Sequence, residues 1–222
     1  MRRCSLCRIE GHQRNQCENH PFGGRYDHAV TNLSWTPESV DRGTKCFSPQ
    51  TNGYPGGYPV GFIDWVRSKG WWGDQRLHVP CGLVVDPHPG QVARVDVLAP
   101  PITNATAVFD ASDSDQWPEW SERFDLVMID KPYTEDLAES LYDTKECYAG
   151  IDRFVSNAKK TVAPGGYLCT LDYQVPKRPG DDWNLIACWG IYCAMSVRHM
   201  MCFQVWQKDG DRRDQGLEKW IT

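Results

Sequence analysis

The sequence predicts an α/β fold with a mostly parallel sheet and helices on both faces, preceded by a small metal-binding segment. Two observations lead to this prediction. Strand and helix signals alternate along the chain after residue 61, which is typical of parallel sheets. Four residues of metal-ligating types also lie close together in the first 20 residues. The length of 222 residues allows one such domain with a small appendage.

The composition excludes several classes of protein. Hydrophobic residues make up 41% and charged residues 24%, so neither a disordered nor a fibrous chain is expected. There are ten cysteines, but no apolar signal stretch follows the first residues, so we expect reduced thiols and a cytoplasmic location. No apolar run reaches the roughly 18 residues that a membrane span needs. We therefore expect a soluble protein that does not contact membranes.

Residues 4–17 follow the pattern C-x2-C-x4-H-x4-C. Thiolate and imidazole ligands suit a closed tetrahedral Zn²⁺ site. A segment this short cannot bury a core, so the metal would supply most of its folding free energy, on the order of 10 kcal/mol. In an alternative ligand set, Cys17 and His20 form the second pair and His12 is free. The expected ligands of the structural zinc are Cys4, Cys7, His12 and Cys17.

This spacing resembles the CCHC zinc knuckle of retroviral nucleocapsid proteins and of many RNA-binding or single-strand-binding proteins. The resemblance covers about 14 residues within the segment 1–20. It implies a nucleic-acid partner, DNA or RNA, although knuckles also dock on proteins. Residues 1–25 contain five arginines and two glutamates, whereas the net charge of the whole chain is −5. The basic end that could hold phosphates, through Arg8 and Arg14, is therefore the N-terminus.

Residues 21–60 are rich in Gly, Pro, Ser, Thr and Asn and show little periodicity. We expect them to form a docked linker rather than a domain. The main domain is expected at 61–222.

The strands of the main domain are predicted from short apolar runs. The run at 124–129 is uniformly apolar apart from one aspartate, as in a buried strand. The last two runs are expected to form a closing antiparallel pair. The predicted strands are 76–79, 93–98, 105–109, 124–129, 167–171, 185–193 and 197–207.

Three helices are predicted, one before these strands and two between them. The first begins at Phe62 and ends near Gly70. Thr134 is expected to cap the second, because acidic residues fill the first turn that follows it. The third has apolar residues at helical spacing over 151–162 and stops at the Pro164-Gly165-Gly166 run. The short interval between the first two strands leaves little room for a helix.

Polar or turn-forming residues follow four of the predicted strands. The carboxyl ends of parallel strands meet at one edge of a sheet, where such folds bind ligands. The sequence therefore predicts a binding site at that edge, formed by Pro80, Cys81, Gly82, Asp96, Asp110 or Asp113, and Asp130, Lys131, Pro132 and Tyr133.

This order of strand ends resembles the Rossmann-like class I S-adenosylmethionine-dependent methyltransferase fold over residues 61–208. The resemblance implies a sheet with an antiparallel last strand. It implies that the turn Pro80-Cys81-Gly82 approaches the methionine part of the cofactor, although the usual GxGxG loop is absent. By the same resemblance, Asp96 binds the ribose hydroxyls, and Asp110 or Asp113 binds the adenine.

The run Asp130-Lys131-Pro132-Tyr133 resembles the (Asp/Asn/Ser)-Pro-Pro-(aromatic) loop of amino-methyltransferases, with Lys131 in place of a proline. The resemblance implies an enzyme that methylates adenine N6 or, second, cytosine N4. Asp130 and the Lys131 carbonyl would accept the amino hydrogens, and Tyr133 would stack on the base. The lysine would also add a cation near the substrate.

Three alternatives remain open. In the first, the acceptor is a protein or a small molecule, and the knuckle is a docking module. In the second, the chain is a non-catalytic nucleic-acid-binding adaptor whose methyltransferase fold has lost the cofactor loop. The third is a cysteine nucleophile. Pro80-Cys81 resembles the Pro-Cys nucleophile of cytosine-C5 methyltransferases, but that pair belongs after the fourth strand.

Overall fold

A computed structural model describes residues 40–49, 57–193 and 200–210. The chain divides into two compact units, 1–40 and 41–222, and the fold below is that of the second unit. The predicted zinc ligands and the segment 1–20 lie outside the described residues. The predictions of a zinc site and of a knuckle therefore remain predictions.

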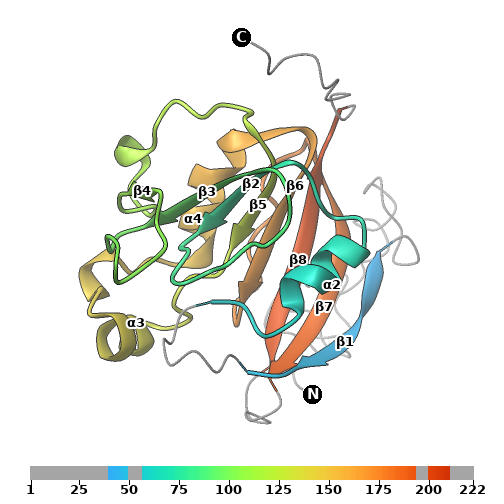
Figure 1. Cartoon of the computed structure of the whole chain (residues 1–222). Helices are drawn as coiled ribbons and strands as arrows, with labels where there is room; N and C mark the ends of the chain where they lie inside the picture. The colour runs from blue at the N-terminus through green and yellow to red at the C-terminus, as the bar shows by residue number, and fades with distance from the viewer. Residues whose placement is uncertain (1–39, 50–56, 194–199, 211–222) are drawn as a thin grey trace, which may run out of the picture. The chain divides into compact units, whose positions relative to one another are not determined.

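The main unit contains a mixed sheet of eight strands in the order β1-β7-β8-β6-β5-β2-β3-β4 (Figure 1). All neighbouring pairs are parallel except those of β8, which is antiparallel to both β6 and β7. The predicted mostly parallel α/β sheet with an antiparallel last strand is confirmed. The strands are β1 Asp41–Phe47, β2 Gln75–Val79, β3 Gln91–Asp96, β4 Ala107–Val108, β5 Phe124–Ile129, β6 Val162–Asp172, β7 Trp183–Cys193 and β8 Met201–Lys208.

The helices cover opposite faces of the sheet, as predicted. Neighbouring residues of a strand point to opposite faces. On β5, Leu126 belongs to one buried cluster with α2 (Phe62–Ser68), and Val127 belongs to another with α4 (Ile151–Ala158). A further helix, α3 (Glu135–Tyr142), follows the β5 loop. No helix in the described part of the chain is long and apolar enough to cross a membrane.

Thr134 caps α3 as predicted, because its hydroxyl accepts a hydrogen bond from the Leu137 N–H at 3.2 Å. The helix ends at Tyr142, and the residue after it, Asp143, has a left-handed conformation with a φ of 53°. Three 3₁₀ turns, η3 (Ser114–Gln116), η4 (Lys145–Cys147) and η5 (Lys159–Thr161), complete the regular structure of the described residues.

The connection between β2 and β3 contains no helix, as its length predicted. A buried arginine organises it instead. The Arg76 guanidinium donates to the Asp86 carboxylate at 2.6 Å, to the Gly73 carbonyl at 2.8 Å and to the His88 carbonyl at 3.0 Å. Both charged side chains are fully buried. This network holds the residues that follow β2 close to the sheet without the usual crossover helix.

Asp86 also contacts His78, whose Nε2 lies 3.4 Å from its carboxylate, while the Tyr58 hydroxyl lies 3.4 Å from His78 Nδ1. Burial alone would raise the pKa of Asp86, but hydrogen bonds from His78, Arg76 and the His88 N–H hold it well below the usual range. The buried chain Tyr58–His78–Asp86–Arg76 thus connects the segment before α2 to the β2–β3 connection.

The segment 21–60, predicted as a linker, contains strand β1, which the sequence analysis did not predict. β1 pairs with β7 along its whole length and forms one edge of the sheet. Its sequence, DRGTKCF, lacks the apolar pattern of a strand, because most of its side chains are exposed. Gly43 lies against the Trp189 ring, where an added Cβ would come within 2.8 Å of ring carbon.

Candidate functional site

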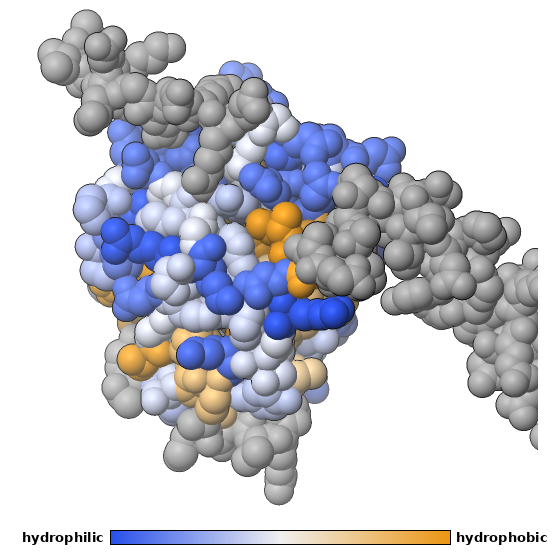
Figure 2. Space-filling view, turned by 90° about the vertical axis from the view of Figure 1, so that its right-hand side faces the viewer, coloured by the Kyte–Doolittle hydropathy of each residue, from blue (hydrophilic) through white to orange (hydrophobic). Residues whose placement is uncertain are grey.

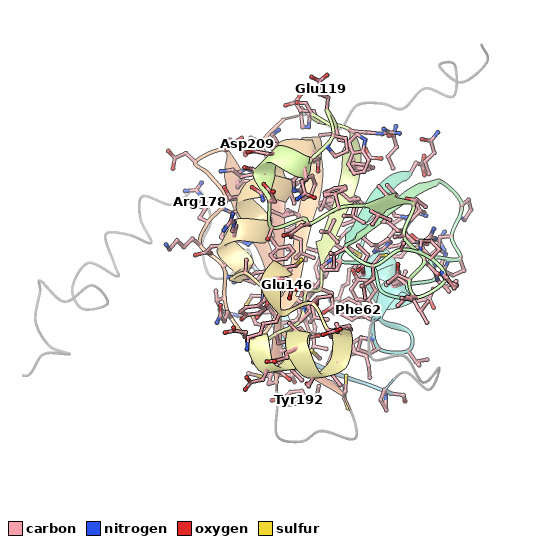
Figure 3. All side chains as sticks on the ribbon, turned by 90° about the vertical axis from the view of Figure 1, so that its left-hand side faces the viewer. Phe62, Glu119, Glu146, Arg178, Tyr192 and Asp209 are labelled. Carbon is pink, nitrogen blue, oxygen red and sulfur yellow. The ribbon has the colours of Figure 1, made fainter. Side chains whose placement is uncertain are left out.

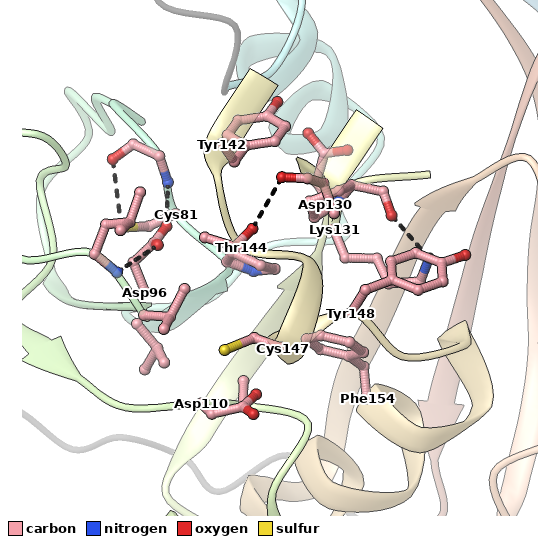
Figure 4. A pocket seen from close by; sticks show the side chains of 18 of the residues that line it. Cys81, Asp96, Asp110, Asp130, Lys131, Tyr142, Thr144, Cys147, Tyr148 and Phe154 are labelled. Carbon is pink, nitrogen blue, oxygen red and sulfur yellow. Dashed lines mark hydrogen bonds between the residues drawn. The ribbon is translucent and has the colours of Figure 1, made fainter. Parts of the chain in front are cut away.

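A cavity among the described residues lies at the carboxyl ends of the central strands. In the sheet, β3 and β4 lie on one side of β2, and β5 lies on its other side. The connections that leave β2 and β5 therefore run in opposite directions, and a crevice is expected between them. The cavity there has a volume of about 200 Å³. One wall comes from α3 and the turn after it (Figure 4). The predicted site residues that line it are Pro80, Cys81, Gly82, Asp96, Asp110, Asp130, Lys131, Pro132 and Tyr133.

The turn after β2 is bound to the end of β3. Gly82 has a φ of +49°, which a glycine adopts at low cost. Its N–H donates to one Asp96 oxygen at 2.9 Å, and the Leu98 N–H donates to the other at 3.0 Å. Asp96 is 7% exposed. Each of its oxygens keeps a second lone pair for a further donor, so Asp96 can accept hydrogen bonds from two adjacent hydroxyls.

Cys81 is unsuited to act as a nucleophile. Burial and the neighbouring Asp96 carboxylate raise the pKa of its thiol to about 12. The thiolate is the reactive form of cysteine, so this thiol stays protonated and inert at neutral pH. The alternative in which Pro80-Cys81 is a nucleophilic pair therefore loses its chemical basis.

The structure separates the two aspartates that the sequence analysis left as alternatives. Asp110 lines the cavity, and its carboxylate accepts a hydrogen bond from the Ser112 N–H at 2.8 Å. Asp113 is not among the lining residues; it caps η3 by accepting from the Asp115 N–H at 3.0 Å. The side chain available to a ligand beyond β4 is thus Asp110, close to the apolar lining residues Leu98, Phe109 and Phe154.

Asp130 lies directly after β5, where its N–H donates to the Val79 carbonyl at 3.1 Å. One carboxylate oxygen accepts a hydrogen bond from the Tyr133 hydroxyl at 2.8 Å. Burial raises the pKa of Asp130 to about 7, with a further increase from Asp172, against the opposing effects of Tyr133 and Lys131. Asp130 therefore changes between its neutral and ionised forms near neutral pH.

Lys131 does not offer a free cation to the cavity, contrary to the expectation from sequence. Its Nζ lies 3.0 Å from the Asp172 carboxylate, and both side chains are fully buried. The same Nζ donates to the Pro132 carbonyl at 3.0 Å and lies 4.9 Å from the centre of the Tyr148 ring. The charge of Lys131 is thus neutralised by Asp172, a residue that the sequence analysis did not identify.

Tyr133 has two contacts that the sequence did not predict. Besides donating to Asp130, its ring packs against Tyr173, with ring centres 4.5 Å apart. Tyr142, Tyr148 and Tyr173 also line the cavity. The end of β6 provides both Asp172 and Tyr173, and applying the strand-end rule to that strand as well would have found them. Aromatic rings therefore surround the part of the cavity next to Asp130.

The cavity suits the nucleoside part of S-adenosylmethionine by the chemistry of its lining. Asp96 offers two acceptors to the ribose hydroxyls, and Asp110 lies among apolar side chains that suit an adenine ring. Pro80, Cys81 and Gly82, which the sequence predicts near the methionine part of the cofactor, line the cavity together with Gly57. The lysine of the described lining, Lys131, is already paired with Asp172.

Within the ranges 40–49, 57–193 and 200–210, no group of three or more His, Cys, Asp or Glu side chains is arranged to hold a metal ion. This finding does not reach the predicted zinc ligands, which lie outside those ranges.

No protein-family model matches the chain, and no curated protein matches it in sequence. Among solved structures, the chain is similar to a protein described in connection with the conversion of a disulfide bond into a thioacetal group during echinomycin biosynthesis. The identity is 14% and the TM-score 0.44, over 68% of this chain and 82% of that chain. The function proposed below therefore depends on the residues around the cavity.

Proposed function

We propose that the chain is an S-adenosylmethionine-dependent methyltransferase that acts on an exocyclic amine of a nucleic-acid base, adenine N6 before cytosine N4. One observation carries the proposal: Asp96, Asp110 and the Asp130–Tyr133 loop, which lie far apart in sequence, line a single cavity at the strand ends (Figure 4). Ligands bind at this position in open α/β sheets.

The roles of the residues follow from the chemistry of methyl transfer. The bound cofactor supplies a methyl group on a sulfonium, which an amine lone pair displaces in line, so the protein mainly orients the amine. Ionised Asp130 and the Lys131 carbonyl accept the two amino hydrogens. The tyrosines beside Asp130 provide faces on which a flat base stacks. A base from a duplex has to be flipped out to reach them, whereas a single-stranded base arrives at a lower cost.

Cofactor binding tests the first part of this proposal. Asp96→Ala is expected to weaken the binding of S-adenosylmethionine about 10- to 100-fold, because it removes hydrogen bonds to a charged acceptor worth roughly 1.5–3 kcal/mol. Isothermal titration calorimetry measures the loss. Asp113→Ala is the matched control, because this aspartate also follows β4 but does not line the cavity, and it should bind as the wild type does. No binding heat for the wild-type protein at millimolar cofactor would favour the non-catalytic adaptor.

The acceptor is a second question, and one observation favours a protein or small-molecule amine. The wall formed by α3 and η4 exposes four acidic side chains, Glu135, Asp136, Glu139 and Glu146, of which Figure 3 labels the last. Lys145 forms ion pairs with Glu135 and Glu139. Such a rim repels phosphates and attracts cationic groups. Transfer of tritiated methyl groups to single-stranded DNA, duplex DNA, RNA or total protein distinguishes these acceptors directly.

The N-terminal segment is proposed to bind Zn²⁺ and to supply the nucleic-acid contacts that the acidic rim cannot. Deleting residues 1–20 is expected to remove most salt-sensitive binding to DNA or RNA, while cofactor binding by the main unit stays unchanged. Binding measured at several salt concentrations tests this expectation. The matched variant Cys4→Ser/Cys7→Ser should lose zinc by elemental analysis and reproduce the deletion. Unchanged nucleic-acid binding after the deletion would contradict the assignment.

A further inference from the structure

The Lys131–Asp172 ion pair is buried beside the cavity. Its atoms lie 3.0 Å apart, and neither side chain is exposed. Removing two charges from water is costly, and replacing such a pair with apolar residues is often neutral or stabilising. A contribution to stability is therefore a weak reason for this pair to lie beside the cavity.

The ion pair joins the loop that follows β5 to the last residue of β6, next to the loop that follows that strand. On the β5 side, the Lys131 Nζ also donates to the Pro132 carbonyl at 3.0 Å and is covered by the Tyr148 ring. On the β6 side, the second oxygen of Asp172 accepts a hydrogen bond from the Gln174 N–H at 2.8 Å. The Tyr133–Tyr173 ring contact adds a second connection between the same two segments.

We infer that Asp172 is a positioning residue for the methyl transfer proposed above, on which this inference rests: by holding the Lys131 ammonium group, it fixes the Asp130–Tyr133 loop at the acceptor amine. Asp172 acts through Lys131 and contacts neither the amine nor the cofactor. The side chain of Lys131, anchored at its far end, thus restricts the loop in the place where a proline ring would otherwise fix φ.

The arrangement also affects the proton equilibrium of Asp130. Asp172 raises the pKa of Asp130 and Lys131 lowers it. Among the described residues, the other titratable groups that interact electrostatically with Asp130 are Tyr133 on its own loop, Tyr58 from the segment before α2 and Cys193 at the end of β7. Removing the charge of Asp172 should therefore lower the pKa of Asp130, and removing that of Lys131 should raise it.

The experiment measures kcat and KM for methyl transfer between about pH 5 and pH 9 in full-length protein. Asp172→Asn is expected to reduce kcat about 10- to 100-fold, as a small misplacement of catalytic groups does, with little change in the KM for S-adenosylmethionine. In Asp172→Asn, the acidic limb of the plot of kcat against pH should move to lower pH, because the pKa of Asp130 falls. In Lys131→Met, the same limb should move to higher pH, because the pKa of Asp130 rises. A loss of packing alone would move neither limb in a charge-dependent direction.

The double variant Lys131→Met/Asp172→Asn covers the case in which a single variant fails to fold, because it leaves no unpaired buried charge. It should melt near the wild-type temperature but keep the lower kcat. Asp152→Asn and Lys177→Met are the matched controls, because they break an ion pair whose side chains are exposed and that lies away from the cavity. Both should behave as the wild type does.

The outcomes distinguish this inference from the proposed function. An active wild-type protein, with wild-type kcat and pH profile in Asp172→Asn and in the double variant, would overturn the inference and leave the function intact. A folded wild-type protein that transfers no methyl group to any acceptor in the tritium panel would overturn both.

Discussion

Asp130→Ala is expected to reduce methyl transfer at least about 100-fold, because the acceptor amine loses a positioned hydrogen-bond acceptor. Asp130→Asn is expected to retain activity, because an amide oxygen also accepts a hydrogen bond. The two variants differ most clearly in pH dependence. In the wild-type protein the pKa of Asp130 is raised to about 7, so kcat should fall about tenfold per pH unit below that value. In Asp130→Asn this acidic limb should be absent.

Rates measured from acidic to alkaline pH, with Asp152→Asn as a control on an exposed aspartate of α4 that does not line the cavity, check this expectation. A wild-type rate that is independent of pH, or full activity in Asp130→Ala, would remove Asp130 from the acceptor site.

Thermodynamic stability gives a second measurement on the same residue, independent of catalysis. The pKa of Asp130 is higher in the folded protein than the 3.8 of a free side chain, so the folded state binds this proton more tightly. The contribution of Asp130 to the free energy of unfolding should therefore decrease as pH rises from about 4 to about 7 and stay constant above. Asp130→Asn should be more stable than the wild type at pH 8, by roughly 2–4 kcal/mol, and should lose this advantage at about pH 4. Urea unfolding at the two pH values measures the difference.

Asp86→Ala is expected to lower the free energy of unfolding by about 3–5 kcal/mol, because it leaves the buried Arg76 guanidinium without a counter-charge. Its pH dependence has the opposite sign to that of Asp130. The folded protein holds the pKa of Asp86 well below its usual range, so this stabilisation is present above about pH 4 and is lost as the pH falls below it. Asp86→Ala should therefore differ most from the wild type at neutral pH.

Urea unfolding of Asp86→Ala beside Asp41→Ala tests this prediction. Asp41 pairs with Lys69 at 2.8 Å, but both side chains are partly exposed, so breaking this pair should cost less than about 1 kcal/mol. Equal effects of the two substitutions would show that the Arg76 network does not hold the β2–β3 connection. Because that connection begins at Pro80 and lines the cavity, Asp86→Ala should also weaken cofactor binding.

Much of the fold could be predicted because it depends on patterns of apolar residues. The buried strand at 124–129 matches β5 residue for residue. The Thr134 cap and the antiparallel pairing of the last two strands are also confirmed. These features depend on local hydrogen bonding and burial, both of which leave a signal in short stretches of sequence.

The remaining features could not be predicted because they contradict the usual preferences of the residues involved. Arginine and lysine are rarely fully buried, yet Arg76 and Lys131 are, each paired with an aspartate on a different segment of the chain. The sequence around one charged residue does not reveal its partner, since each of these residues considered alone is predicted to lie on the surface. Strand β1 was missed for a similar reason, because its exposed position at the edge of the sheet leaves no apolar alternation to detect.

The two edges of the sheet also bear on how copies of the protein behave toward one another. An exposed edge strand offers unpaired N–H and C=O groups to which another chain can add. At one edge, β4 is only two residues long. At the other, β1 pairs with residues 187–193 of β7 and presents the charged residues Asp41, Arg42 and Lys45. The face in Figure 2 is mainly hydrophilic, with small separate apolar areas. Both edges therefore resist the strand-to-strand addition that leads to aggregation.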